Sequence, residues 1–188
     1  MLVLRELAFG SRRFSELKSD LPGISANVLA QRLTELEERG LVVRKKLPPP
    51  ASVQVYEATP WALEVAPIIG RLGRWAARSP RHDPTLPLSH AAIMMSLQVM
   101  LDPDRARGME GRFGFRFGET AYVAVLRDER LHVERRIADD SDVLMTTTPE
   151  ALAGVIYGGA PLESIAVEGD MDLARRFATL FPLPDKVV

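Results

Sequence analysis

The stretch Phe14–Lys46 reads FSELKSDLPGISANVLAQRLTELEERGLVVRKK, and it decides the fold of the first part of the chain. Its apolar residues Phe14, Leu17 and Leu21 are spaced by three and four positions, which predicts a short helix with one buried face. Pro22-Gly23 ends that helix, because proline cannot donate the next backbone hydrogen bond and glycine favours a turn. We expect a tight turn there, followed by a second helix.

The second helix of this stretch begins after Ser25, a residue type favoured as an N-cap. It runs to about Arg39, and Gly40 closes it at C′. Its two faces differ in chemistry. Three leucines share one face, and polar residues lie roughly opposite: Leu29, Leu33 and Leu36 against Asn27, Gln31 and Thr34.

The pattern continues on both sides of these helices. Leu2–Phe9 is an apolar-periodic helix that Gly10 ends. After them, Leu41–Leu47 (LVVRKKL) predicts a strand, and Val53–Ala58 (VQVYEA) alternates and predicts the returning strand. Prolines 48–50 lack backbone N–H groups, so they form the connecting loop.

A further helix follows the two strands. Thr59 is its N-cap and Pro60 its first residue. An apolar stripe at helical spacing then extends to a tryptophan: Val65, Ile68, Ile69, Leu72 and Trp75. Pro67 lies inside this stripe and kinks the helix or marks its true start.

Residues 80–89 form the expected linker between a domain over 1–79 and a second over 90–188. The linker is centred on Ser79–Pro87, where three prolines in nine residues exclude a regular helix or a central strand. The charge also changes there. Residues 1–79 hold 12 Lys/Arg and 8 Asp/Glu, a net charge of +4, whereas residues 80–188 hold 12 and 17, a net charge of −5. A basic first domain is the one suited to a polyanion.

The second domain has an α+β pattern. A methionine-rich amphipathic helix, His90–Leu101, comes first, and the stretch RFGFRFG then places three phenylalanines on one strand face. The later elements are strands over 120–126, 131–137 and 143–147, a helix from Thr148-Pro149 to Gly158-Gly159, a fifth strand over 165–168, and a last helix capped by Asp170 and ended by Pro182.

Two helices joined by a turn and followed by a basic hairpin are the winged helix-turn-helix arrangement, which places its second helix in the major groove of DNA. Asn27 and Gln31 suit adenine edges, and Arg32 suits guanine or a phosphate. The full predicted DNA-contacting set is Arg12, Arg13, Ser25, Asn27, Val28, Gln31, Arg32, Arg44, Lys45 and Lys46. The alternative from the same pattern is a three-helix bundle with a solvated polar face.

Residues 2–77 resemble the HxlR family of winged helix-turn-helix regulators. The resemblance rests on F-x-E-L, G-I-S, L-x-x-R-L-x-E-L-E-x-x-G-L-V-x-R, the wing prolines, V-x-Y-x-x-T-P and a last helix ending at a tryptophan. It implies binding to double-stranded DNA as a homodimer, with the helix after the wing at the dimer interface; a pure core role for its apolar stripe is the alternative. Family members have a longer segment before the first helix, often with a cysteine, and this chain opens almost inside that helix.

Residues 90–182 resemble the sterol carrier protein type 2 domain in their order of elements. That resemblance implies an apolar small-molecule or lipid ligand held between a sheet and helices. The predicted ligand-contacting residues are Met94, Met95, Phe113, Phe115, Phe117, Tyr122, Met145, Ile156 and Phe177. The alternative is that they are ordinary core residues.

Several classes of function are not expected. The chain has no cysteine, which excludes disulfides, thiolate metal ligands and a thiol redox sensor in this chain. It shows no signal peptide and no apolar run long enough to enter a membrane, so we expect a cytoplasmic protein. No G-x-S-x-G, P-loop or G-x-G-x-x-G is present, and the three histidines are scattered. We expect neither an enzyme nor a metal or other cofactor.

The sequence as a whole therefore predicts an α+β protein with a winged helix-turn-helix domain and a sterol-carrier-like domain whose mainly antiparallel sheet has about five strands. The function predicted is a homodimeric DNA-binding transcriptional regulator modulated by an apolar ligand. One alternative is a lipid or apolar-ligand carrier whose first domain serves only dimerisation.

Overall fold

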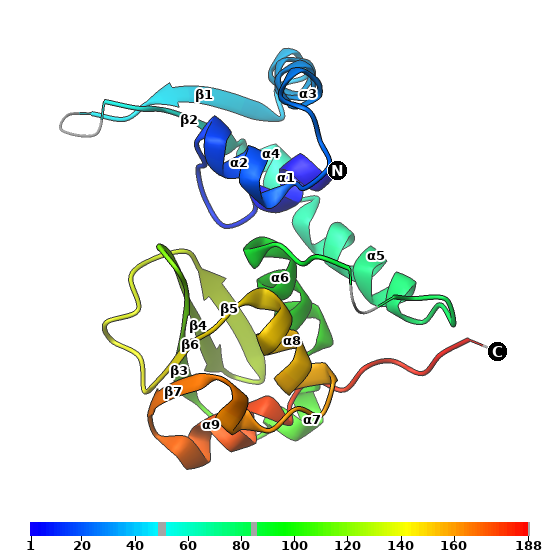
Figure 1. Ribbon diagram of the computed structural model, residues 1–188, viewed down its shortest axis with the longest axis vertical. Coiled ribbons are helices and arrows are strands. Elements are labelled where there is room, and N and C mark those ends of the chain that lie inside the picture. Colours follow the sequence, from blue (N-terminus) through cyan, green and yellow to red (C-terminus); the bar gives the residue numbers. More distant parts are fainter. Residues whose placement is uncertain (49–51, 84–85, 188) are drawn as a thin grey trace. The chain divides into compact units, whose positions relative to one another are not determined.

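The chain folds as two compact units, Met1–Ile69 and Gly70–Val188, in a computed structural model that describes residues 1–48, 52–83 and 86–187 (Figure 1). We expected the boundary after residue 79. The division lies earlier, inside the helix α5 (Ala66–Ala77), because this helix packs on the rest of the second unit from Gly70 onward: a Cβ at Gly70 would lie 3.4 Å from Met95 Cγ. Pro49, Pro50 and Pro84, part of the expected loop and linker, lie outside the described residues.

The first unit has the predicted order of elements. These are α1 (Leu2–Glu6), α2 (Phe14–Asp20), α3 (Ala26–Glu38), β1 (Val42–Lys46), β2 (Gln54–Ala58) and α4 (Pro60–Leu63). The strands β1 and β2 pair antiparallel, with Arg44 opposite Tyr56. A single bridge joins Arg12, in the segment before α2, to Tyr56, so the hairpin is anchored to the helical part of the unit.

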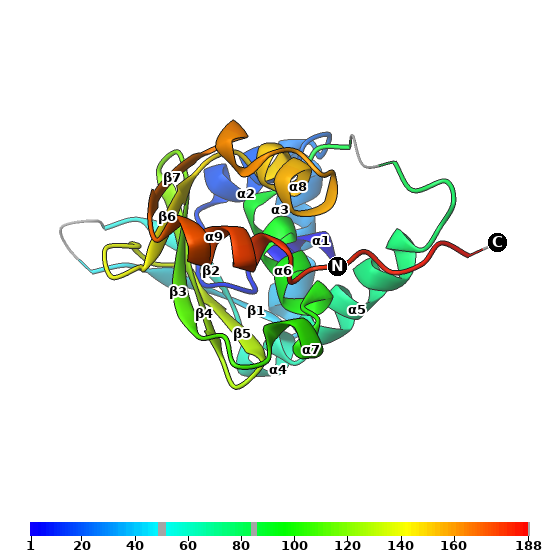
Figure 2. The same cartoon turned by 90° about the horizontal axis from the view of Figure 1, so that it is seen from below.

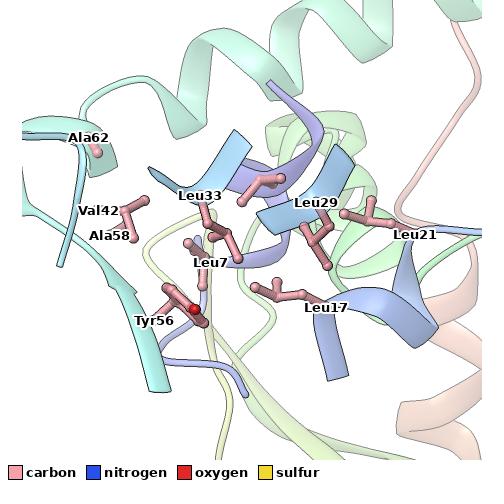
Figure 3. Packing of buried hydrophobic residues seen from close by; sticks show 10 residues of the cluster. Leu7, Leu17, Leu21, Leu29, Leu33, Val42, Tyr56, Ala58 and Ala62 are labelled. Carbon is pink, nitrogen blue, oxygen red and sulfur yellow. The ribbon is translucent and has the colours of Figure 1, made fainter. Parts of the chain in front are cut away.

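The core of the first unit lies between its helices and the base of the hairpin (Figure 3). Leu17 from α2 and Leu29 and Leu33 from α3 are fully buried beside Val42 and Tyr56 of the hairpin. The leucine face predicted for α3 is therefore the buried face. Burying it fixes the rotation of α3 about its axis and turns the opposite, polar face to solvent.

The ends of α3 are set by local signals. The hydroxyl of Ser25 accepts a hydrogen bond from the N–H of Val28 at 3.2 Å. At the other end Gly40 has a φ of +69°, and the N–H of Leu41 donates to the carbonyl of Leu36 at 2.9 Å. This is a Schellman motif, which requires a residue in the left-handed region and therefore favours glycine. Both caps were predicted.

Two helices differ from the expected ranges. The first ends at Glu6 and not at Phe9, with Leu7 as its C-cap. The helix expected from Pro60 to Trp75 is two helices, α4 and α5, because Pro67 occupies the second position of α5, where a missing N–H costs nothing. Pro67 therefore marks the start of a helix and does not kink one.

The second unit contains a five-stranded sheet in the order β5-β4-β3-β6-β7 among the described residues. Its elements are α6 (His90–Met100), α7 (Pro103–Ala106), β3 (Gly111–Phe117), β4 (Thr120–Arg127), β5 (Arg130–Glu134), β6 (Val143–Thr146), α8 (Pro149–Tyr157), the 3₁₀ turn Leu162–Ser164, β7 (Ala166–Gly169) and α9 (Met171–Ala178). Neighbouring strands are antiparallel except β3 and β6, which are parallel. The mainly antiparallel five-stranded sheet was predicted, whereas α7 and the 3₁₀ turn were not.

The helices α6, α8 and α9 cover one face of this sheet (Figure 2). The phenylalanines of β3 point to that face, where the Phe113 ring stacks on Phe177 of α9 with 3.9 Å between the ring centres. Gly114 faces the other way: a Cβ there would lie 2.6 Å from Ser141 Oγ and 2.8 Å from Ala138 Cβ. The segment before β6 therefore packs directly on the backbone of β3.

No helix of the described residues combines the length and the apolar character that crossing a bilayer requires.

Candidate nucleic-acid interface

The polar face of α3 is the first part of the candidate interface. Asn27, Gln31 and Arg32 are exposed on it, and the side chain of Val28 is 45% exposed. Ser25 is also exposed, but its hydroxyl is occupied as the N-cap acceptor of Val28 N–H. The first turns of α3 thus offer two amides, one guanidinium and one small apolar side chain to a ligand in solvent.

A carboxylate on the same helix holds two of these groups. Glu35 accepts a hydrogen bond from Gln31 Nε2 at 3.0 Å and forms an ion pair with Arg32, whose Nη1 lies 2.6 Å from its carboxylate. The pKa of Glu35 is lowered, first by the hydrogen bond from Arg32, so this carboxylate stays charged at neutral pH. We did not predict Glu35, although its spacing of three and four residues from its partners is a sequence signal for such pairs.

The basic hairpin supplies the second part. Arg44, Lys45 and Lys46 are all exposed on β1. Arg44 pairs with Glu37 of α3 at 2.7 Å, and its guanidinium lies 5.4 Å from the centre of the Tyr56 ring. The hydrogen bond that Arg44 donates to Glu37 is the first cause that raises the pKa of Arg44.

Lys45 points to the other face of the hairpin, because side chains alternate along a strand. Its ammonium lies 2.7 Å from Glu57 of β2. Both Glu37 and Glu57 were missed, because they are 7 and 12 residues away from their partners in sequence. The fold brings them together with the cations: α3 lies beside β1 for Glu37, and β2 pairs with β1 for Glu57.

Arg12 and Arg13 are placed differently from each other. We expected Arg12 to contact a phosphate of DNA. Its side chain is only 2% exposed and is ion-paired with Asp20, so it cannot make that contact. Its backbone forms the bridge to Tyr56, which turns the side chain inward. Arg13 is exposed; its backbone N–H donates to Glu16 at 2.6 Å, and its carbonyl accepts from Leu17 N–H at 3.1 Å. We therefore keep Arg13 in the candidate interface and leave Arg12 out.

Comparison with known proteins assigns this part of the chain. The model of the HxlR-like helix-turn-helix family matches residues 1–83. The HTH-type transcriptional regulator YvaP of Bacillus subtilis (strain 168) is 40% identical over 75 residues, which cover 40% of this chain and 69% of the relative. The chain belongs to the HxlR-like helix-turn-helix family.

A second relative of this HxlR-like chain is the HTH-type transcriptional regulator YodB of the same organism. It is 32% identical over 75 residues, which cover 40% of this chain and 67% of YodB. A solved structure of the reduced form of YodB covers 44% of this chain and 81% of that chain, with 30% identity and a TM-score of 0.39.

The solved sec-alkylsulfatase Pisa1 from Pseudomonas sp. is also similar in part. The match covers 52% of this chain and 16% of the sulfatase, with 19% identity and a TM-score of 0.45. Neither value is high enough to transfer the fold or the activity of the sulfatase to the HxlR-like chain.

Beyond the HxlR-like part, the predicted ligand-contacting residues are all buried in the second unit. All five aromatic ones pack on each other: the ring centres of Phe115 and Phe117, for example, are 6.4 Å apart, and those of Phe117 and Tyr122 are 6.1 Å apart. Met94 and Met145 are fully buried as well. These residues are packed as a core, which is the alternative that the sequence left open.

An open pocket of about 340 Å³ lies elsewhere in the second unit. Of the predicted ligand residues it includes Ile156, and its lining is Arg105, Ile156, Tyr157, Ala178, Thr179, Phe181, Pro182 and Leu183. The phenol oxygen of Tyr157 lies 2.7 Å from Ser96 Oγ, and burial raises the pKa of this phenol. The pocket was missed because its lining comes from three segments far apart in sequence.

Metal-ligating side chains do not gather in the described part of the chain: no group of three or more His, Asp or Glu there could hold an ion. His132 and Glu134 do share a strand face, with His132 Nε2 3.3 Å from a carboxylate oxygen of Glu134.

Proposed function

We propose that this chain is a transcriptional regulator that binds double-stranded DNA through α3 and the β1–β2 hairpin. One observation carries the proposal: the leucine face of α3 is buried, so Asn27, Gln31 and Arg32 are held on an exposed face beside the basic strand β1. The relatives, which are named as transcriptional regulators, support it.

The two parts of the interface have different tasks. The amides of Asn27 and Gln31 contact base edges in the major groove, where bidentate amide pairs distinguish adenine. Arg32 contacts guanine or a phosphate. Arg13, Arg44, Lys45 and Lys46 contact phosphates, which sets register and affinity but carries no sequence information.

Alanine substitutions separate these tasks. DNA duplexes selected by the purified protein from a random pool define the operator, and fluorescence anisotropy then measures affinity. Asn27→Ala and Gln31→Ala should each cost about 1–3 kcal/mol on the operator and little on random DNA. The control Gln98→Ala removes an exposed amide in α6 of the second unit and should change neither affinity.

The hairpin variant Lys45→Ala/Lys46→Ala should weaken all duplexes alike and flatten the dependence of affinity on salt. The assignment is reversed if this variant changes sequence preference while the α3 variants do not. A protein that retains no duplex at low salt contradicts the whole proposal.

We also propose that the protein works as a homodimer through α5. Ile68, Leu72 and Trp75 recur at spacings of four and three residues and are 52%, 47% and 69% exposed. A helix face this apolar is stabilised when a partner covers it, and a twofold dimer matches two half-sites of a palindromic operator.

Finally, we propose that an apolar small molecule or lipid bound in the second unit modulates DNA binding. A five-stranded sheet with helices on one face supports the sterol-carrier-like interpretation of this unit. Because the predicted phenylalanines and methionines pack as a core, we place the ligand in the pocket lined by Ile156, Phe181 and Leu183.

The pocket is connected to α5 by the C-terminal segment. A few residues after Leu183, the N–H of Val187 donates to the carbonyl of Arg78 at 2.8 Å, and Lys186 Nζ donates to the carbonyl of Ala77 at 3.0 Å. A ligand that displaces Leu183 would change the contacts at the end of the proposed dimer helix. A ligand shifts DNA affinity only if it binds the two states of the protein unequally.

A further inference from the structure

Three carboxylates lie among the residues that we propose to contact DNA, and each is bound to one or two of them. Glu35 holds Gln31 and Arg32, at 3.0 and 2.6 Å. A surface that binds a polyanion would gain affinity by keeping acidic residues away. On this surface Arg32, Arg44 and Lys45 are each paired with an acidic residue instead.

Two cations of the hairpin, Arg44 and Lys45, are likewise each paired with a carboxylate. Glu37 lies 2.7 Å from Arg44, and Glu57 lies 2.7 Å from Lys45. The cations are about half exposed, at 46% and 54%, so solvent and phosphates reach them while they are paired. Arg32, paired with Glu35, is 60% exposed.

These pairs change what a phosphate gains by binding. A phosphate that approaches Arg44 or Lys45 must displace a carboxylate or share the cation with it, and the carboxylate repels the phosphate in either case. Each pair therefore removes part of the electrostatic attraction that all duplexes share. Non-operator DNA is held by that attraction alone, whereas an operator also forms hydrogen bonds between its bases and the protein. Each pair therefore lowers the affinity of all duplexes by a similar factor, and only an operator retains strong binding.

We propose that Glu37 and Glu57 keep binding to non-operator DNA weak, and that Glu35 is a specificity-determining residue for base recognition by α3. The inference rests on the proposed DNA-binding function and concerns the same surface. Glu37 and Glu57 act on the phosphate contacts. Glu35 is a positioning residue: it holds the Gln31 amide and the Arg32 guanidinium in one orientation on α3, ready for one arrangement of base edges.

The first experiment uses the full-length protein and tests Glu37 and Glu57, which pair with the hairpin cations Arg44 and Lys45. Glu37→Gln/Glu57→Gln keeps the size of both side chains and removes two negative charges. Affinity for a random-sequence duplex should rise about two- to five-fold for each carboxylate removed, the size expected for an exposed ion pair. The plot of log affinity against log salt should become steeper, by up to about 0.9 for each cation released to a phosphate.

The matched control is Glu38→Gln/Glu64→Gln, which removes the same charge from two exposed glutamates outside these pairs. It reports the effect of net charge alone and should shift affinity and slope much less. Equal shifts for the two double variants overturn the role of Glu37 and Glu57. Circular dichroism melting of both variants checks that neither change acts through unfolding.

The second experiment tests Glu35. Glu35→Gln should bind random DNA more tightly and change operator affinity little, so the ratio of operator to random affinity falls about two- to five-fold. Selection from a random pool should return a looser consensus at the positions contacted by Gln31 and Arg32. A carboxylate can itself accept a hydrogen bond from cytosine N4. The positioning role is overturned if Glu35→Gln loses affinity only for operators that carry one particular C·G pair, while its affinity for random-sequence DNA is unchanged.

The outcomes also separate this inference from the function on which it rests. If neither the wild-type protein nor any variant retains a duplex at low salt, the DNA-binding proposal fails. If the wild-type protein binds and selects an operator, but Glu37→Gln/Glu57→Gln binds random DNA no more tightly and Glu35→Gln discriminates as well as wild type, only the present inference fails.

Discussion

At the scale of single residues, Arg12 and Arg13 are neighbours with opposite roles. Arg12→Ala leaves Asp20 without its buried partner, and breaking such a pair costs about 3–5 kcal/mol. We expect Arg12→Ala to lower the free energy of unfolding by that amount, measured by urea denaturation followed by circular dichroism. Arg13→Ala, at an exposed position, should leave stability unchanged and weaken DNA binding. An Arg12→Ala variant as stable as wild type would contradict the buried placement of this side chain.

We expect Gly114→Ala and Gly154→Ala to change the stability of the protein in opposite directions. A Cβ at Gly114 meets Ser141, Ala138 and Leu144 at 3.0 Å or less, so Gly114→Ala overpacks β3 and should destabilise the second unit by about 1–3 kcal/mol. Gly154 lies inside the helix α8, where a Cβ meets only Ala160 at 3.8 Å. Gly154→Ala should stabilise the protein by up to about 1 kcal/mol, because glycine is a poor helix former. Thermal melting of the two variants tests the sign as well as the size.

At the scale of elements, the exposed apolar face of α5 predicts the oligomeric state. Ile68→Asp places a charge in the proposed dimer seam, where burying it unpaired is unfavourable. The variant should sediment as a monomer and lose affinity for a two-half-site operator while keeping its helical content. Ile137→Asp is the matched control, since Ile137 is 71% exposed and lies outside α5. A wild-type protein that is folded and monomeric at micromolar concentration refutes the dimer.

At the scale of the whole molecule, the pocket and the C-terminal segment predict that ligand binding is coupled to DNA binding. Ala178→Trp adds a large ring to the pocket lining, whereas Ala151→Trp adds the same ring to an exposed position of α8 outside that lining. We expect decanoate to bind the wild-type protein in native mass spectrometry and to change operator affinity within the range of about 5- to 150-fold that is typical of coupled sites.

Ala178→Trp should lose both the bound molecule and the change in operator affinity, and Ala151→Trp should keep both. Decanol in place of decanoate tests whether Arg105, which lines the pocket, recognises a carboxylate. If the two tryptophan variants respond to decanoate in the same way, the ligand binds somewhere other than this pocket.

The sequence by itself determined the features that depend on near neighbours in the chain. The leucine spacing of α3, the Ser25 cap, the glycine at position 40 and the alternation of β2 each act over about four residues, so the helix-turn-helix and the hairpin could be predicted. The same local reasoning found the exposed polar face of α3. It also predicted five strands in the second unit, because hairpin turns such as Asp128-Glu129 interrupt clear alternation.

Only the tertiary structure decided what depends on contacts between distant segments. A basic residue in a turn is usually exposed, yet Arg12 is buried because its backbone pairs with Tyr56, 44 residues later, and its side chain meets Asp20. The phenylalanines of β3 form a core and not an open cavity because α9 returns Phe177 onto them. Glu37 and Glu57 join the proposed DNA interface for the same reason. Each of these outcomes depends on which segments the fold brings together, and residue spacing along the chain carries no information about that.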